Sequence, residues 1–263
     1  ADKNRLDFVH RAFLTQYTGN ECGYCPYMIH IIRQLAEENY IPEKAVLAAV
    51  HSYTNVDKAF IKRPKVSNYP YLHVDLKSGV SHSSGKGYIS GLIDESVSTP
   101  VKAGISVNPV LYKDENKLVV TVSVKAAEDG IFNVGAWLLQ DDIFSVQADK
   151  DGVQDKYGYP NGEFNMHDNC VRLMDSDYMG TYFGRLIGPM KKSDVRTKTF
   201  VIDLNTKWTN TGTSPLPTWD QVLNEKLHLA VFVSYGYKKT NGKVYYSVCN
   251  AIDCPITAPT PFE

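Results

Sequence analysis

The sequence lacks the features that would place it in a membrane or on nucleic acid. No apolar run reaches the roughly 18 residues that a transmembrane helix needs, and no signal sequence is recognisable at Ala1. The formal net charge of the 263 residues is −1, with no long run of one sign. Nucleic acid is therefore not an expected partner, and a membrane is expected only through a lipid anchor outside these residues.

Signatures of several enzyme classes are also missing. The chain contains no G-x-S-x-G, H-E-x-x-H, Walker or dinucleotide-binding pattern. Hydrolase, zincin and nucleotide chemistry therefore have no support in the sequence. We expect no cofactor.

Cysteine is scarce. The five cysteines are Cys22, Cys25, Cys170, Cys249 and Cys254, too few for a fold that is built on disulfides at this length. Their odd number leaves at least one thiol without a partner inside the chain. Cys249 and Cys254 either close a small disulfide loop or stay as two buried thiols, and Cys170 has no expected partner.

What the chain does have is the composition of a globular protein that can bury a core, with 43% apolar and 22% charged residues. Its length suits one large domain or two ordinary ones. The pattern changes near residue 100, where helix-like periods give way to short alternating runs rich in valine, threonine and tyrosine. We therefore predict two domains, residues 1–100 and residues 101–263.

The first domain is organised around the single C-x-x-C, Cys22-Gly23-Tyr24-Cys25. A predicted strand, Leu6–Tyr17, precedes it, and a predicted helix over residues 22–39 contains it, with Pro26 in the first turn. A helix N-terminus favours a thiolate over a thiol. A two-residue spacer at that position can bring two sulfurs close enough to bridge.

Alternating elements follow. The apolar run Ala45–His51 is typical of a buried parallel strand, and a short helix is predicted around Val56–Ile61. A strand then begins at Pro70, and a helix over Lys86–Ser98 ends before Pro100.

In this order of elements, residues 11–98 resemble a thioredoxin fold. That family places a cis-proline at the start of a later strand, beside the cysteine pair, and Pro70 is the matching position, preceded by Tyr69. The Cys-Gly-Tyr-Cys tetrad is similar to that of periplasmic disulfide isomerases. Two departures are Glu21, where the family usually has tryptophan, and a proline after the second cysteine.

The second domain reads as strands separated by turns, with a long polar loop over residues 148–170. The predicted strands are Gly104–Tyr112, Lys117–Lys125, Asn133–Gln140, Val195–Leu204, Lys226–Tyr237 and Val244–Asn250. A short helix or turn is predicted over Leu216–Asn224. We predict an all-β, antiparallel β-sandwich of immunoglobulin or jelly-roll type after an α/β thioredoxin-like domain.

A second resemblance covers most of the chain. Gly135–Ile143, Gln147 and Met166–Arg172 resemble segments of the twenty-eight-kilodalton outer-membrane protein family of envelope lipoproteins. That family joins a thioredoxin-like domain to a β-sandwich. The resemblance implies export to a bacterial envelope, in the periplasm or at the outer membrane.

Two hypotheses for function remain. In the first, the protein is a thiol–disulfide oxidoreductase or isomerase that acts on protein thiols and disulfides or on an envelope redox partner. Cys22, expected nearer to solvent, attacks and Cys25 resolves the mixed disulfide, while the resemblance implies that Gly23, Tyr24, Tyr69 and Pro70 meet the substrate. In the second, the cysteine pair is a structural disulfide in a non-enzymatic lipoprotein whose sandwich binds protein or glycan. Zinc is not expected, because two further ligands are needed and only His30 and His51 are candidates.

Overall fold

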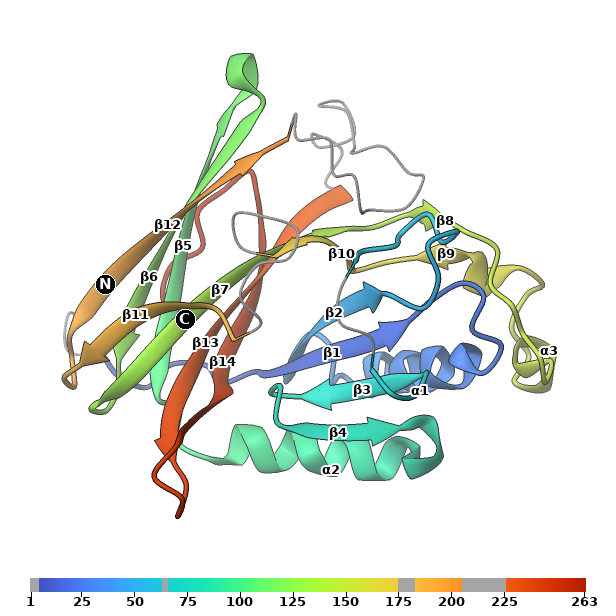
Figure 1. The fold of residues 1–263 in the computed structure, drawn as a ribbon, viewed down its shortest axis with the longest axis horizontal. Coiled ribbons are helices and arrows are strands. Elements are labelled where there is room, and N and C mark those ends of the chain that lie inside the picture. Colours follow the sequence, from blue (N-terminus) through green and yellow to red (C-terminus); the bar gives the residue numbers. More distant parts are fainter. Residues whose placement is uncertain (1–4, 63–65, 175–182, 205–225) are drawn as a thin grey trace.

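The computed structural model describes residues 5–62, 66–174, 183–204 and 226–263 (Figure 1). The helices are α1 (Cys25–Glu37), α2 (Gly85–Ser98) and α3 (Val153–Lys156), with 3-10 turns at η1 (His82–Ser84), η2 (Lys113–Glu115) and η3 (Glu163–Asn165). The strands are β1 (Ala12–Thr18), β2 (Ala45–His51), β3 (Tyr71–Val74), β4 (Ser78–Ser81), β5 (Ala103–Tyr112), β6 (Lys117–Ala126), β7 (Gly130–Gln140), β8 (Ile143–Phe144), β9 (Met166–His167), β10 (Cys170–Met174), β11 (Arg185–Met190), β12 (Val195–Asp203), β13 (Leu227–Lys238) and β14 (Val244–Pro255).

The first hundred residues form an α/β layer. β1 pairs in parallel with β2 and antiparallel with β3, which pairs with β4. Both longer helices cover the same face of these strands (Figure 1), and side chains such as Met28, Leu35, Ile89 and Ile93 pack there against Leu14 of β1. The apolar residues of α1 recur at helical spacing, so they form one stripe of the helix that is buried against the sheet.

The same sheet continues into the second half of the chain. Among the described residues nine strands form it, in the order β14-β13-β7-β10-β2-β1-β3-β4, with β11 paired to the other end of β7. The junction is narrow, because β10 pairs with β2 only where Cys170 lies opposite Ala49. Strands from both sides of residue 100 therefore share one sheet, and the division into two domains stays a prediction.

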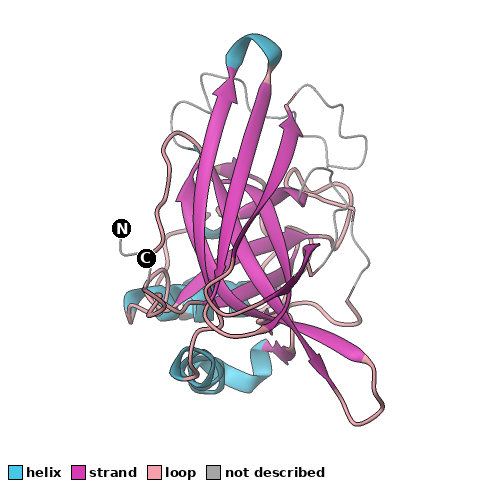
Figure 2. Ribbon diagram, turned by 90° about the vertical axis from the view of Figure 1, so that its left-hand side faces the viewer, coloured by secondary structure: helices cyan, strands magenta, loops and turns pink. Residues whose placement is uncertain are grey.

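The region after residue 100 is rich in sheet, as predicted. A three-stranded antiparallel sheet, β12-β6-β5, packs on β7, β13 and β14 through a core that includes Val122, Val134 and Val231. Figure 2 shows these long strands layered above the helices. The protein is accordingly a mixed α/β and mostly β molecule, while the immunoglobulin or jelly-roll type stays a prediction.

A second core joins the two halves. Phe13 of β1 stacks on Phe232 of β13 with ring centroids 4.8 Å apart and meets the edge of Trp137 of β7 at 5.2 Å. The sheet curls enough for β14 to return to the β1–β3 region, where the Val248 N–H donates to the Asp75 carbonyl at 2.9 Å. This core lies on the face of β1 and β2 opposite to α1.

Some sequence-based element predictions were wrong. β1 begins at Ala12 and not at Leu6. Residues 56–59 form turns and bends without a helix, and Phe60 makes a parallel β-bridge with His51. The segment predicted as one loop over residues 148–170 contains α3, η3 and β9. The turn or helix predicted over 216–224 lies outside the described residues. No helix in the described ranges is long and apolar enough to span a membrane.

Candidate functional site

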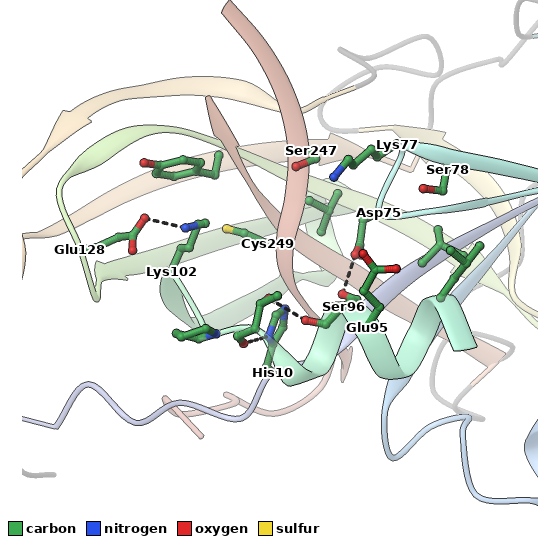
Figure 3. Close-up of a pocket in the computed structure, with 16 residues that line it drawn as sticks. His10, Asp75, Lys77, Ser78, Glu95, Ser96, Lys102, Glu128, Ser247 and Cys249 are labelled. Carbon is green, nitrogen blue, oxygen red and sulfur yellow. Dashed lines mark hydrogen bonds and ion pairs between the residues drawn. The ribbon is translucent and has the colours of Figure 1, made fainter. Parts of the chain in front are cut away.

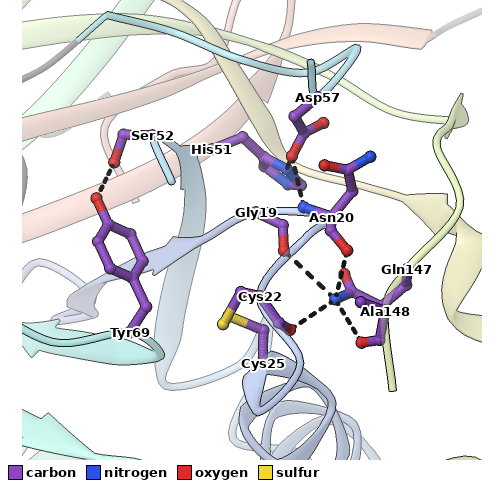
Figure 4. Close-up of a disulfide and its surroundings, with 10 residues drawn as sticks. All are labelled: Gly19, Asn20, Cys22, Cys25, His51, Ser52, Asp57, Tyr69, Gln147 and Ala148. Carbon is purple, nitrogen blue, oxygen red and sulfur yellow. Dashed lines mark hydrogen bonds and ion pairs between the residues drawn. A yellow bond between two sulfur atoms is a disulfide. The ribbon is translucent and has the colours of Figure 1, made fainter. Parts of the chain in front are cut away.

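The cysteine pair lies at the junction between β1 and α1. Cys22 and Cys25 form a disulfide, with an S–S distance of 2.08 Å and Cα atoms 5.3 Å apart (Figure 4). The Cys22 N–H donates to the Gly19 carbonyl at 3.1 Å, and the Cys25 N–H donates to the Cys22 carbonyl at 3.1 Å. These turns place the disulfide at the N-terminus of a 13-residue helix with proline in its first turn, where partial positive charge stabilises a thiolate.

Both cysteines are buried in this structure. Cys22 is 3% exposed and Cys25 is 0% exposed. Cys22 is the less buried of the two by this small margin, but neither side chain is open to solvent in this disulfide state. The reason is tertiary, because a segment from the second half of the chain covers the motif.

We call this segment, residues 145–150, the strap. The side-chain amide of Gln147 lies within hydrogen-bond distance of the carbonyls of Gly19, Asn20 and Cys22, at 3.3, 3.2 and 3.1 Å (Figure 4). The backbone N–H of Ala148 also donates to the Asn20 carbonyl, at 2.6 Å. The strap thus runs along the motif. It supplies both hydrogen bonds to the Asn20 carbonyl and adds one to the Gly19 and Cys22 carbonyls, which already accept N–H groups of the loop.

The far end of the strap contacts the two residues between the cysteines. The Lys150 N–H donates to the Gly23 carbonyl at 3.0 Å, and its Nζ donates to the Tyr24 hydroxyl at 2.9 Å. A Cβ added to Gly23 would lie 2.9 Å from Lys150 Cβ, so the close approach depends on glycine. Tyr24 itself is 41% exposed. Gly23 and Tyr24, predicted as substrate-binding residues, here contact the strap.

The Tyr69–Pro70 peptide bond is cis and leads into β3. The Tyr69 hydroxyl bonds with Ser52 Oγ at 2.8 Å, and its ring meets that of Tyr53 at 5.1 Å. Tyr53 in turn packs against Gly19 at the start of the motif loop. Figure 4 shows Tyr69 on the side to which the disulfide sulfurs point. Substrate contact by Tyr69 and Pro70 stays a prediction.

A buried polar cluster adjoins the motif loop. His51 Nδ1 lies 2.8 Å from Asp57 Oδ2, and its Nε2 lies 3.6 Å from Cys170 Sγ. Asp57 also accepts the N–H of Asn20 at 2.8 Å, so one carboxylate joins the motif loop to the cluster. His51, Asp57 and Cys170 are each at most 1% exposed.

The charges in this cluster compensate one another. Burial by itself lowers the pKa of His51, but the adjacent Cys170 and Asp57 outweigh it and raise the pKa to about 10. For Asp57, burial raises the pKa, yet His51 and two backbone N–H donors hold it below its usual range. Burial and the neighbouring His51 charge lower the pKa of His167 to about 4. The cluster is therefore a protonated His51 beside an ionised Asp57, next to a neutral His167.

The remaining thiols lie in apolar surroundings. Cys249 and Cys254 are unpaired and both belong to β14, so the disulfide alternative for this pair is wrong. Burial raises the pKa of the Cys254 thiol to about 12. Within the described ranges no group of three or more metal-ligating side chains gathers at one place.

A pocket of about 330 Å³ lies between α2 and β14, lined by residues from both halves of the chain (Figure 3). Asp75 lines it and accepts the Phe13 N–H at 2.8 Å and the Ser96 hydroxyl at 2.6 Å. Burial raises the pKa of Asp75 to about 6. None of the predicted site residues lines this pocket.

Sequence reasoning missed part of this site. Gln147 entered only as part of a family resemblance, and His51 only as a rejected zinc ligand. Asp57 carried no motif at all. Asp57 lies 6 residues from His51 and 37 residues from Asn20 in the chain. His51 in turn contacts Cys170 across 119 residues. No local sequence pattern connects residues so far apart.

Comparison with known proteins supports the fold. No family model matches the chain, and no curated protein matches it in sequence. Among solved structures it is similar to HBP35 of Porphyromonas gingivalis, with a TM-score of 0.64 and 14% sequence identity, covering 97% of this chain and 77% of that one. At this identity the likeness concerns the fold alone. The resemblance to the twenty-eight-kilodalton outer-membrane protein family stays a prediction.

Proposed function

We propose that this protein exchanges thiols and disulfides at Cys22–Cys25, with a thioredoxin-like first half as the redox unit and a β-sandwich as its partner-binding unit. The observation that carries the proposal is the disulfide at the N-terminus of α1, in a strand–turn–helix unit that begins at β1. The cis peptide before Pro70 at the start of β3 and the β1-α1-β2-β3-β4-α2 order support the thioredoxin-like assignment.

Oxidation of a substrate dithiol at this disulfide takes two steps. A substrate thiolate attacks Cys22 Sγ, the Cys22–Cys25 bond breaks, and the electron pair leaves on Cys25 as a thiolate. A second substrate thiolate then attacks the substrate sulfur of the mixed disulfide and releases the Cys22 thiolate. Two electrons pass from the substrate dithiol to the cysteine pair, and the reverse sequence reduces a substrate disulfide.

The roles of the two cysteines are tested by single substitutions. With dithiothreitol as electron donor, the protein is expected to accelerate insulin reduction, and Cys22→Ser is expected to abolish the acceleration. In Cys25→Ser, the Cys22 thiolate should attack a disulfide-linked peptide dimer and release one peptide thiol, and the mixed disulfide of Cys22 with the other peptide should accumulate, as measured by mass spectrometry. Cys254→Ala, which removes a buried and weakly acidic thiol, is the matched control and should keep the activity. An unchanged rate in Cys22→Ser would refute the proposal.

The burial of both cysteines favours a second candidate, a structural disulfide in a non-enzymatic scaffold. The strap closes over the motif, and Cys22 is 3% exposed. A structural disulfide typically has a reduction potential below about −300 mV, whereas exchange enzymes lie between about −270 and −120 mV. Equilibration of the pair with glutathione or dithiothreitol buffers therefore separates the two candidates.

For location, we propose the bacterial cell envelope. The envelope-family resemblance of residues 135–143, 147 and 166–172 supports it, together with a disulfide of the kind that persists in oxidising compartments. Fractionation of cells that express the native gene, with detection by antibody, is the direct test. Recovery in the cytoplasm alone would contradict this location.

A further inference from the structure

A second cavity lies behind the disulfide, on the face of the sheet that α1 covers. Its volume is about 250 Å³, below the roughly 300–1,000 Å³ of sites for drug-sized ligands. Its walls come from α1, from the C-terminal ends of β1 and β2, and from the loop between β9 and β10. It is separate from the pocket of Figure 3, with which it shares no lining residue.

Six of the fourteen residues that line this cavity are aliphatic, and half are polar or charged. Ile29 and Ile32 of α1, Leu47 and Ala49 of β2, and Ile41 all line it. Ile29 and Ile32 are only partly buried, whereas Met28 and Ile31 on the neighbouring stripe of the same helix are buried in the core. The apolar stripe of α1 that contains Ile29 and Ile32 therefore faces the cavity, and no side chain of the described residues fills the space between this stripe and the sheet.

The floor of the cavity carries polar atoms that lack partners. Gln16 and Thr18, at the end of β1, are 5% and 2% exposed. Gln16 Nε2 and Thr18 Oγ1 are buried and have no hydrogen-bond partner among the described residues, and both side chains line the cavity. A buried amide N–H₂ without an acceptor costs about 1–3 kcal/mol. An acceptor that enters the cavity would remove this cost once either side chain turns its polar atom toward it.

The cationic side chains that line the cavity are already paired, and its one acidic side chain is Asp168. Arg33 pairs with Glu163 at 2.6 Å, and protonated His51 pairs with Asp57 at 2.8 Å. A buried carboxylate would therefore find no free cation among these side chains, and burying it without one is costly. A neutral acceptor fits the floor better than an anion.

We propose that this cavity binds a small, uncharged aliphatic molecule that bears a carbonyl oxygen. The carbonyl accepts hydrogen bonds from Gln16 Nε2 and the Thr18 hydroxyl, and the aliphatic part packs on Ile29, Ile32 and Leu47. The site is independent of thiol–disulfide exchange, because its lining includes neither cysteine of the pair.

The test uses 2-hexanone as the probe and ¹H–¹⁵N NMR as the readout. Titration is expected to shift the Gln16 side-chain N–H₂ and the amides of Ile29 and Ile32, with saturation on the order of 1 mM for so small a ligand. Pentanoate, a charged acceptor of similar size, is expected to bind more weakly. Absence of saturable shifts at these groups, as in a cavity that holds water only, would overturn the proposal. Tighter binding of pentanoate would do the same.

Two variants separate the polar floor from the apolar wall. Gln16→Leu removes the donor with little change of shape and should weaken 2-hexanone binding about fivefold. Ile32→Trp should fill the cavity and abolish binding without touching the floor. Glu37→Trp, on an exposed position of the same helix, is the matched control and should bind as the wild type does. Equal affinity in the wild type and both test variants would refute the site.

Discussion

At the scale of single residues, two polar side chains decide how the cysteine pair is presented. Gln147 donates its amide to the carbonyls of the motif loop, and Asp57 accepts the Asn20 N–H from the same loop. Both are buried, Gln147 at 5% and Asp57 at 0% exposure. Buried hydrogen bonds of this kind are costly to leave unmade. The loop therefore keeps its shape only while the strap and the His51 cluster stay in place.

The substitution Gln147→Leu tests the role of the strap. It keeps the approximate size of the side chain but removes the donor. The Gly19, Asn20 and Cys22 carbonyls each lose one hydrogen bond to the strap, so the strap should open more often. We expect glutathione to reduce Cys22–Cys25 several-fold faster than in the wild type, measured by alkylation and mass spectrometry. Val146→Ala, at a 64% exposed strap position, serves as the control. An unchanged reduction rate in Gln147→Leu would mean that the strap does not limit access.

At the scale of elements, His228 joins three of them. Its Nδ1 lies 2.7 Å from Asp253 of β14, and its Nε2 lies 3.2 Å from Asp141, which follows β7. His228 itself is the second residue of β13, and Asp141 also accepts the Asn169 N–H before β10. Burial lowers the pKa of His228, but its hydrogen bonds to Asp141 and Asp253 outweigh this and raise it to about 10. One imidazolium thus fixes the ends of neighbouring strands.

This raised pKa predicts a pH dependence of stability. The native state holds the proton on His228 up to about pH 10, whereas the unfolded chain releases it near pH 6.5. The stabilising contribution is therefore complete below pH 6.5 and falls as pH rises toward 10. Urea unfolding of wild type and His228→Gln at pH 6 and pH 10 measures it. The difference in free energy of unfolding should shrink at pH 10. His51 titrates over a similar range in both proteins and cancels, and a constant difference would contradict the prediction.

At the scale of the whole molecule, one sheet and one aromatic core connect the two halves. Phe13 contacts Trp137 and Phe232, which lie more than a hundred residues later in the chain. The backbone hydrogen bond from Val248 of β14 to Asp75, which follows β3, also joins the two halves. Because the halves share buried surface and ladder hydrogen bonds, opening either half exposes core of the other.

The substitution Phe13→Ala is expected to destabilise both halves together, by about 3–5 kcal/mol. Hydrogen exchange at α1 and at β13 should increase in parallel in this variant. Phe144→Ala, at a position that is 52% exposed, should cost less than about 0.5 kcal/mol. Loss of protection in α1 alone would show that residues 1–100 open as a separate unit.

The sequence by itself determined the local features of this protein. Cys22 and Cys25 are three residues apart, so a turn into a helix suffices to join them, and the alternation of Lys117–Lys125 was enough to predict β6. Only the tertiary structure decided whether solvent reaches the disulfide, because Gln147 is 125 residues from Cys22 in the chain. The same holds for Cys170, which meets His51 across 119 residues. Such contacts follow from how strands pair and curl, which a periodic pattern along the chain does not encode.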